Sequence, residues 1–186
     1  GLYLATEGID GSFINRIGAD KNSALFHPIP YNIDYGRIYR ESQSLAEGER
    51  GAWLDDSTRD GADFKYRGDS LEEYSGIFNN AVTKYSSVDA ALVIEAIRSL
   101  EPSEVLATPE DYWDIEKVVK FFVAAAFAPN CDSYLGNTSQ NYYLLLSKGK
   151  LSVIPWDHDR AFHLDDFKIA GSDNAAVDWP IDSPLI

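Results

Sequence analysis

Residues 141–162 read NYYLLLSKGKLSVIPWDHDRAF, two runs with the composition of β-strands. A Lys-Gly-Lys turn at 148–150 separates them, which indicates a tight antiparallel hairpin. Counting back from that turn sets Asn141 opposite Trp156, or within one residue of Asp157. Directly opposed side chains have Cβ atoms about 5 Å apart. The hairpin therefore predicts that Asn141 and Asp157 meet at its open end.

Acidic residues gather around that open end. Asp157 and Asp159 are two residues apart, so in an extended chain they share one side and repel each other. The polar loop before the hairpin adds Asp132. Three carboxylates and the Asn141 amide, without clustered His or Cys, favour Mg²⁺ or Mn²⁺ over zinc. A divalent cation would offset the repulsion, and because Mg²⁺ also takes phosphate oxygens as ligands, phosphoryl transfer is the leading chemistry.

Composition restricts the alternatives. The chain has 186 residues, 45% hydrophobic and 13% aromatic, as in a single folded domain. Its net charge of −14 argues against nucleic-acid binding. The single cysteine, Cys131, excludes an internal disulfide and a cysteine zinc site. The longest wholly apolar run, 121–128, is short of the roughly 18 residues of a membrane span, so no transmembrane segment is expected.

Helical spacing dominates the middle of the chain. Ser70 and Glu73 have capping-box spacing, and apolar residues recur at steps of three and four as far as Tyr85. Ser87 starts a second helix, and a Thr-Pro pair at 108–109 opens the longest one. The expected elements are a strand at 2–6, a short helix within 10–18, an extended segment at 24–32, a loop at 41–69, helices at 70–85, 87–100 and 108–126, and hairpin strands at 141–147 and 151–157.

A specific family resemblance rests on these motifs. The segment at 141–162, with Asn-Tyr-Tyr-Leu, a turn and Ile-Pro-Trp-Asp-x-Asp-x-x-Phe, resembles the core motif of the CotH (spore coat protein H) kinase family. GLYLATEGIDGSFINR at 1–16 is similar to that family's Gly-x-Tyr…Glu-x-Ile-Asp…Phe block, and ALFHP at 24–28 to its next strand. The resemblance implies an α+β fold like that of atypical protein kinases, with an α-rich lobe and a β-hairpin that carries the metal site.

The same resemblance implies a function. It indicates a kinase that uses ATP and Mg²⁺, with Mn²⁺ as the alternative ion, to phosphorylate Ser or Thr on a protein substrate. That substrate would be a spore-coat or cell-surface protein, and the kinase would be found in the spore coat or outside the cell. No nucleic acid is expected as a partner.

Site residues carry over from the family one by one. Asp132 resembles the catalytic acid, and Asn141 and Asp157 resemble the metal ligands. Asp159 would be an auxiliary metal ligand, or a carboxylate that lies next to the ligands without touching the metal. Asn137 competes with Asn141, because Asp132-x-x-x-x-Asn137 has the ordinary spacing of a kinase catalytic loop. Asn141 is preferred because the family motif places its Asn just before the Tyr-Tyr.

Two departures from the family pattern affect the active site. His163 follows Phe162 where the family usually has glycine, so a residue that permits unusual backbone angles is lost. The family's phosphate-binding lysine lies upstream of Gly1. The chain is therefore expected to be one CotH-like kinase domain, 1–186, truncated at both ends. Residues 1–40 would be a remnant of the N-terminal lobe, and 70–186 a helical C-terminal lobe with catalytic loop and hairpin.

Two rival functions stay open. In a glycosyltransferase, Asp157-x-Asp159 would hold Mn²⁺ and a nucleotide-sugar diphosphate, although helices followed by a hairpin do not match the βαβ alternation of such enzymes. In a non-catalytic surface adhesin or pseudokinase, the scaffold would persist without chemistry. The simplest readings make the carboxylates and Asp132 turn caps and Asn141 a strand-entry residue.

Overall fold

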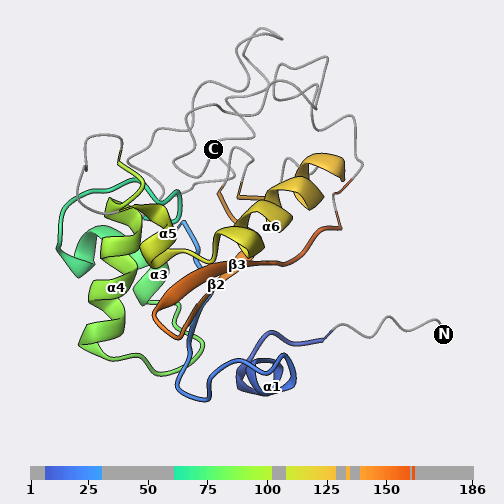
Figure 1. The fold of residues 1–186 in the computed structure, drawn as a ribbon, viewed down its shortest axis with the longest axis horizontal. Helices are drawn as coiled ribbons and strands as arrows, with labels where there is room; N and C mark the ends of the chain where they lie inside the picture. Colours follow the sequence, from blue (N-terminus) through green and yellow to red (C-terminus); the bar gives the residue numbers. More distant parts are fainter. Residues whose placement is uncertain are drawn as a thin grey trace, which may run out of the picture.

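The computed structural model describes residues 7–30, 61–101, 108–128, 133–134, 139–159 and 161. They form a mixed α+β fold in which helices surround one small sheet (Figure 1). In chain order the elements are α1 (Gly11–Arg16), β1 (Ala24–Phe26), the 3₁₀ helix η2 (Leu71–Tyr74), α3 (Ser75–Phe78), α4 (Ser87–Arg98), α5 (Pro109–Tyr112), α6 (Ile115–Phe127), β2 (Tyr142–Ser147) and β3 (Lys150–Pro155). The expected α+β class is confirmed.

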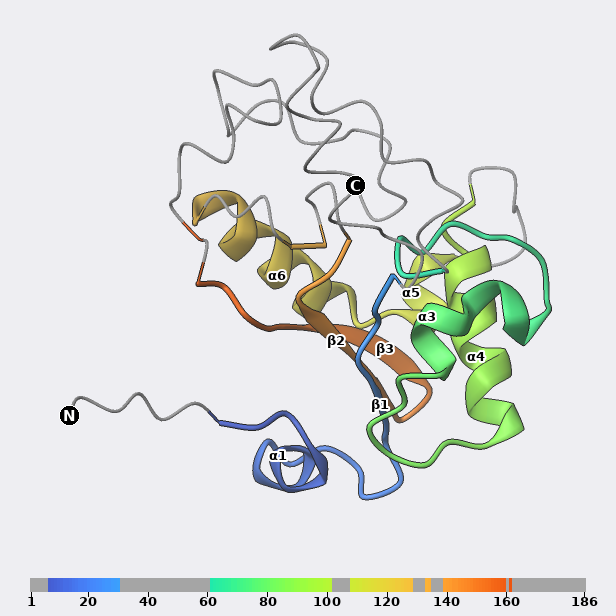
Figure 2. The ribbon, with the colours of Figure 1, turned by 180° about the vertical axis from the view of Figure 1, so that it is seen from behind.

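The predicted hairpin is confirmed with its register. β2 and β3 are antiparallel and pair from Ser147 opposite Lys150 to Tyr142 opposite Pro155. At the turn, Lys148 and Gly149 both have positive φ, 53° and 76°. Two left-handed residues are the geometry of a type I′ turn, whose twist matches that of the flanking strands. β1 adds a third antiparallel strand beside β2, as Figure 2 shows.

The two faces of the sheet bury different clusters. Alternation along β2 turns Tyr142, Leu144 and Leu146 toward the main core with α3, α4 and α6. Tyr143 and Leu145 turn the other way and pack with Ile14 of α1. Figures 1 and 2 accordingly show α1 on one side of the sheet and α4, α5 and α6 on the other.

The helix expected at 70–85 is wrong beyond residue 78. Its start follows the prediction in part, because the Ser70 side chain caps η2 by accepting from the Glu72 amide at 3.4 Å. After α3 the chain leaves helical geometry, since Ala81 forms a bridge with Phe26. The Val82 amide also donates to the Leu25 carbonyl at 2.8 Å. Pairing with the edge of β1 thus replaces the helical hydrogen bonds that the apolar spacing indicated.

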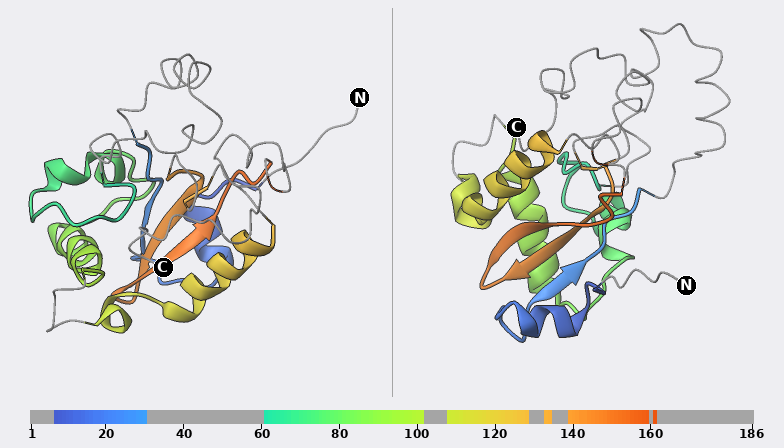
Figure 3. Two further views of the ribbon diagram at one scale, coloured as in Figure 1. Left: turned by 90° about the horizontal axis from the view of Figure 1, so that it is seen from above. Right: turned by 90° about the vertical axis from the view of Figure 1, so that its right-hand side faces the viewer.

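The helix expected at 108–126 is two helices. Thr108 and Asp111 form a capping box, so the predicted start is confirmed. Trp113, however, is extended (φ −109°, ψ 142°) and forms a parallel bridge with Leu151 of β3. The Asp114 amide donates to the Leu151 carbonyl at 2.8 Å, and the Asp114 side chain then caps α6. This break turns α6 alongside the hairpin (Figure 3).

The remaining predictions are two helices, the N-terminal strand and the division into lobes. The short helix is confirmed as α1, whose N-cap Asp10 accepts from the Ser12 amide at 2.8 Å. The helix from Ser87 is confirmed as α4. The strand expected at 2–6 lies outside the described residues. The division of the chain into lobes at 1–40 and 70–186 stays a prediction.

The N-cap of α6 gives a stability prediction. Asp114→Ala should lower the free energy of unfolding by about 1 kcal/mol, because the Lys117 amide loses its acceptor. Glu116→Ala, also in the first turn but exposed and outside the cap, is the matched control and should change the value by less than about 0.5 kcal/mol. Urea unfolding at neutral pH measures both. Equal losses in the two variants would contradict the capping role.

The same cap predicts a pH dependence. A hydrogen bond from the Lys117 side chain lowers the pKa of Asp114 in the folded protein. Its contribution to stability is therefore present above the ordinary aspartate pKa of about 3.9 and is lost as the pH falls through the lower folded-state value. Asp114→Asn, which keeps a capping oxygen, should lose part of this acid sensitivity in urea unfolding between pH 5 and 2. An unchanged pH profile would contradict the assignment.

Candidate active site

The open end of the hairpin joins Asn141 to the Trp-Asp motif. The Trp156 amide donates to the Asn141 carbonyl at 3.2 Å, one step beyond the last pair of the ladder. The register prediction that Asn141 lies opposite Trp156 is therefore confirmed. Asp157 follows directly and is exposed, whereas Asn141 is half-buried. The backbone of Asn141 is thus joined to the residue directly before Asp157 at one end of the sheet.

Backbone conformation at this end is unusual. Asn141 and Asp157 both have left-handed φ values, 61° and 51°. Most side chains avoid this region, but Asn and Asp tolerate it because they are short and polar. The expectation that the chain is extended through Asp157 is wrong, so strand periodicity does not place the carboxylates of Asp157 and Asp159 on one side.

Three aromatic rings line the α1 side of this end. His27, just after β1, stacks on Tyr143 with ring centroids 4.3 Å apart and an interplanar angle of 13°. Trp156 meets the same Tyr143 edge-on, at 5.6 Å and 87°. The His27 amide donates to the Asn80 carbonyl at 3.0 Å, which fixes the backbone that carries the imidazole. Sequence reasoning missed His27, because only the pairing of β1 with β2 brings it here.

Two histidines lie within electrostatic range of Asp157. Burial lowers the pKa of His27, and the Asp157 carboxylate opposes that shift. Burial lowers the pKa of His158 as well, again against the effect of Asp157. His158 Nε2 is buried and has no hydrogen-bond partner in the described part of the chain. Both imidazoles are therefore mainly neutral at pH 7, so their charge does not cancel that of the exposed carboxylate.

The donor set suits a hard cation. Asp157 and Asp159 are exposed carboxylates, and Asn141 adds an amide oxygen. Within the described residues, no group of three or more His, Cys, Asp or Glu side chains could hold a metal ion. Asp132, Asn137 and His163 lie outside the described residues, so the four-residue metal and catalytic site stays a prediction.

Tyr134 attaches the loop before the hairpin to the core. Tyr134 is buried, and its ring meets that of Tyr142 edge-on at 5.4 Å and 88°. It also stacks on Phe64 at 4.8 Å, and its hydroxyl donates to the Asp63 carbonyl at 3.0 Å. Tyr142 is the neighbour of Asn141 in sequence, so this attachment lies directly behind the open end of the hairpin.

The left-handed backbone at residue 157 predicts how substitutions behave. Asp157→Asn and Asp157→Gly should change the free energy of unfolding by less than about 0.5 kcal/mol, because both residues tolerate this conformation. Asp157→Ala should cost about 1 kcal/mol through backbone strain. Chemical denaturation compares the three variants. A fully neutral Asp157→Ala would show that the chain is not held left-handed, and Asp157→Gly is thus the preferred deletion of the carboxylate.

No helix in the described segments is long and apolar enough to cross a membrane.

Comparison with known proteins identifies the family. Neither a curated protein nor a solved structure matches the chain. The model of the family described as "CotH kinase protein" matches residues 1–181. This match covers nearly all of the 186 residues, including the hairpin and the Trp-Asp-x-Asp motif. The chain therefore belongs to the CotH kinase protein family, and this membership suggests an atypical kinase.

Proposed function

We propose that this chain carries the catalytic part of an atypical protein kinase that transfers the γ-phosphate of ATP to Ser or Thr. The observation that carries the proposal is the hairpin register, with the Trp156 amide bonded to the Asn141 carbonyl. It brings the backbone of Asn141 next to the Trp-Asp motif, which supports a shared role for the two residues that the family pattern assigns to the metal. An antiparallel sheet in the described residues, with no βαβ unit, supports the kinase over the glycosyltransferase.

Asp157 and Asn141 would hold Mg²⁺, with Asp159 as the auxiliary carboxylate and Mn²⁺ as the alternative ion. Bound there, the ion would neutralise charge on the transferring phosphate and orient it. The neutral state of His27 and His158 supports this role, because it leaves the Asp157 carboxylate uncompensated by an imidazolium. Exposure of Asp157 keeps that carboxylate accessible to a ligand.

Asp132 would act as the catalytic acid that orients and deprotonates the acceptor hydroxyl. The family pattern supports this role, because Asp132 precedes the hairpin at the position that resembles the family's catalytic acid. In the transfer, the hydroxyl proton passes to Asp132 and the hydroxyl oxygen bonds to the γ-phosphorus. The bond from that phosphorus to the bridging oxygen breaks, and ADP leaves. Asn137 remains the alternative to Asn141 as the amide ligand.

The substrate would be a protein of the spore coat or cell surface, with the kinase in the same compartment. Family membership supports this assignment, because the CotH family is associated with the spore coat. The second candidate is a pseudokinase or adhesin that keeps the scaffold. His163, at a position where the family pattern usually has glycine, is the reason to test this candidate directly.

Paired substitutions separate chemistry from nucleotide binding. Asp132→Asn keeps the shape of the side chain but removes the base, so phosphate transfer should fall by roughly 10²-fold or more while ATP affinity stays within a few-fold. Asp157→Asn should weaken both, because it removes a metal ligand that holds ATP. The measurements are radiolabelled phosphate transfer and nucleotide titration with and without Mg²⁺, on the full-length protein.

Three results would contradict the proposal. Wild-type transfer by Asp132→Asn would reduce Asp132 to a loop cap. Equal ATP affinity with and without Mg²⁺ would remove the metal role of Asp157. Absence of transfer to any acceptor, including the protein itself, would favour the pseudokinase or adhesin. Glu116→Gln, an exposed carboxylate on α6, is the control and should leave transfer and binding unchanged.

A further inference from the structure

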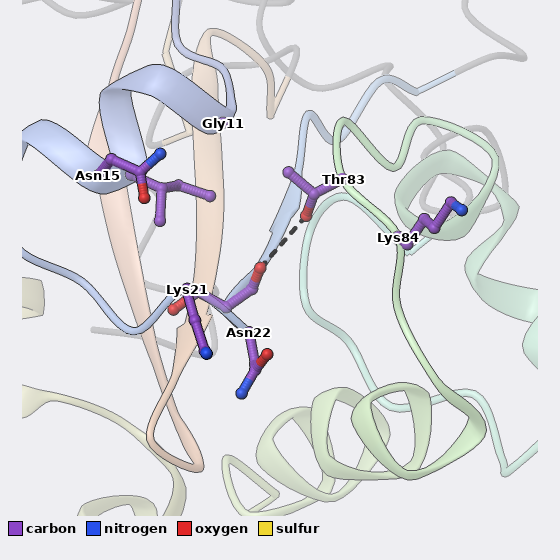
Figure 4. A pocket seen from close by; sticks show the side chains of 8 residues that line it. Gly11, Asn15, Lys21, Asn22, Thr83 and Lys84 are labelled. Atoms are coloured by element: carbon purple, nitrogen blue, oxygen red, sulfur yellow. Dashed lines mark hydrogen bonds between the residues drawn. The ribbon is translucent and has the colours of Figure 1, made fainter.

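A polar pocket lies at the opposite end of the sheet from Asn141 and Asp157. It has a volume of ≈ 470 Å³ and lies between α1, the turn before β1 and the segment before α4. Figure 4 shows it from close by. Its polar lining consists mainly of Asn15, Lys21, Asn22, Ser23, Thr83 and Lys84.

Hydrogen bonds of the Thr83 and Ser23 hydroxyls fix the wall of this pocket. The Thr83 hydroxyl accepts from the Leu25 amide at 2.9 Å and donates to the Ser23 carbonyl at 3.3 Å (Figure 4). The Ser23 hydroxyl in turn donates to the Ser147 hydroxyl at 2.9 Å. These bonds tie the 81–85 segment and the turn before β1 to the sheet. The pocket is therefore built on ordered backbone, not on loosely placed loops.

Four side chains around the pocket are hydrogen-bond donors without a partner among the described residues. The carboxamides of Asn15 and Asn22 and the ammonium groups of Lys21 and Lys84 make no hydrogen bond or ion pair with another described residue. In Figure 4 Lys84 stands at the rim with its ammonium turned outward. Its side chain is long and flexible, so rotation can bring the charge toward a ligand.

The local charge differs from that of the whole chain. The net charge is −14, yet none of the described residues that line this pocket is acidic. Elsewhere, lysines have acidic partners, as in the pairs Lys117–Asp114 and Lys120–Glu116. Lys148, which has no acidic partner among the described residues, lines the adjoining pocket.

Two acids line that adjoining pocket, but backbone amides already use them. Asp20 accepts from the Asn22 amide at 2.8 Å. Asp89 accepts from the Ser86 amide at 2.7 Å in the capping box of α4. Both carboxylates keep their charge, but neither forms an ion pair with a described lysine, so the ammonium groups at this end of the sheet remain open to an anion.

This pocket is separate from the proposed metal site. It adjoins Ser23, next to the Ala24–Leu146 pair at the turn end of β2, whereas Asn141 adjoins the other end. A six-residue strand spans roughly 20 Å, so one phosphate group cannot occupy both places. A peptide chain must contribute about six extended residues to bridge that distance.

We infer that the pocket binds a phosphate monoester, carried as phosphoserine or phosphothreonine on the acceptor protein. The bound phosphoserine or phosphothreonine would lie at least about six residues along the acceptor chain from the hydroxyl that receives the next phosphate. The inference rests on the proposed function, because a protein kinase that modifies one acceptor at several sites meets substrate that already carries its product. A phosphate monoester bears nearly two negative charges and three acceptor oxygens, which match two ammonium groups and two carboxamides.

The test uses binding alone. Nucleotide-free protein is titrated calorimetrically with a Gly-Ser peptide carrying one phosphoserine, with its unphosphorylated form, and with inorganic phosphate. The phosphopeptide should bind and the unphosphorylated form should not. Lys21→Gln/Lys84→Gln should weaken binding at least tenfold, and Asn22→Asp should weaken it too by adding a repelling charge. Lys117→Gln/Lys120→Gln, with the same charge change on α6, is the matched control and should stay within twofold.

Specific results would overturn the inference. They are absence of phosphopeptide binding, binding within twofold of wild type for Lys21→Gln/Lys84→Gln, or an equal loss in the control. Inorganic phosphate that binds as tightly as the phosphopeptide would assign the pocket to free phosphate instead. Asp157→Asn should leave phosphopeptide binding unchanged, so failure of the kinase proposal and failure of this inference are distinguishable.

Discussion

The register of one hairpin determines where the candidate active site forms. Lys148 and Gly149 turn the chain with two left-handed residues, which fixes Ser147 opposite Lys150 and, five pairs later, Tyr142 opposite Pro155. A slip of one residue would move every side chain of a strand to the other face. Tyr142 would then leave the core, and Asn141 would lose its bond to the Trp156 amide. The packing of Tyr142 in the core and the bond at the open end of the hairpin therefore both depend on this register.

Sequence patterns predicted the elements whose hydrogen bonds are local. The hairpin, α1 and the start of α4 were predicted because turn, cap and periodicity all agree there. Both over-long helices failed where a residue pairs with a strand distant in sequence, Ala81 with Phe26 and Trp113 with Leu151. Apolar spacing reports that a residue is buried, but it does not distinguish burial on a helix from burial against a sheet edge.

At the candidate site, too, sequence patterns predicted only the positions that depend on local structure. Asn141 and Asp157 could be placed together because counting along a hairpin needs only its turn. His27 could not, because its stacking on Tyr143 depends on β1 joining the sheet next to β2. The left-handed φ of Asp157 also escaped prediction, since Asp is common in ordinary backbone as well.

Left-handed backbone occurs at both ends of the hairpin, but the residues that adopt it differ. At the turn, Lys148 is followed by Gly149, the residue that suits this conformation best. At the open end, the positions belong to Asn141 and Asp157, although glycine would fit with less strain. Asn and Asp are short polar residues that tolerate this conformation, so the backbone alone accounts for these residue types at both positions. The metal role proposed for them would use the same two side chains without adding strain at either position.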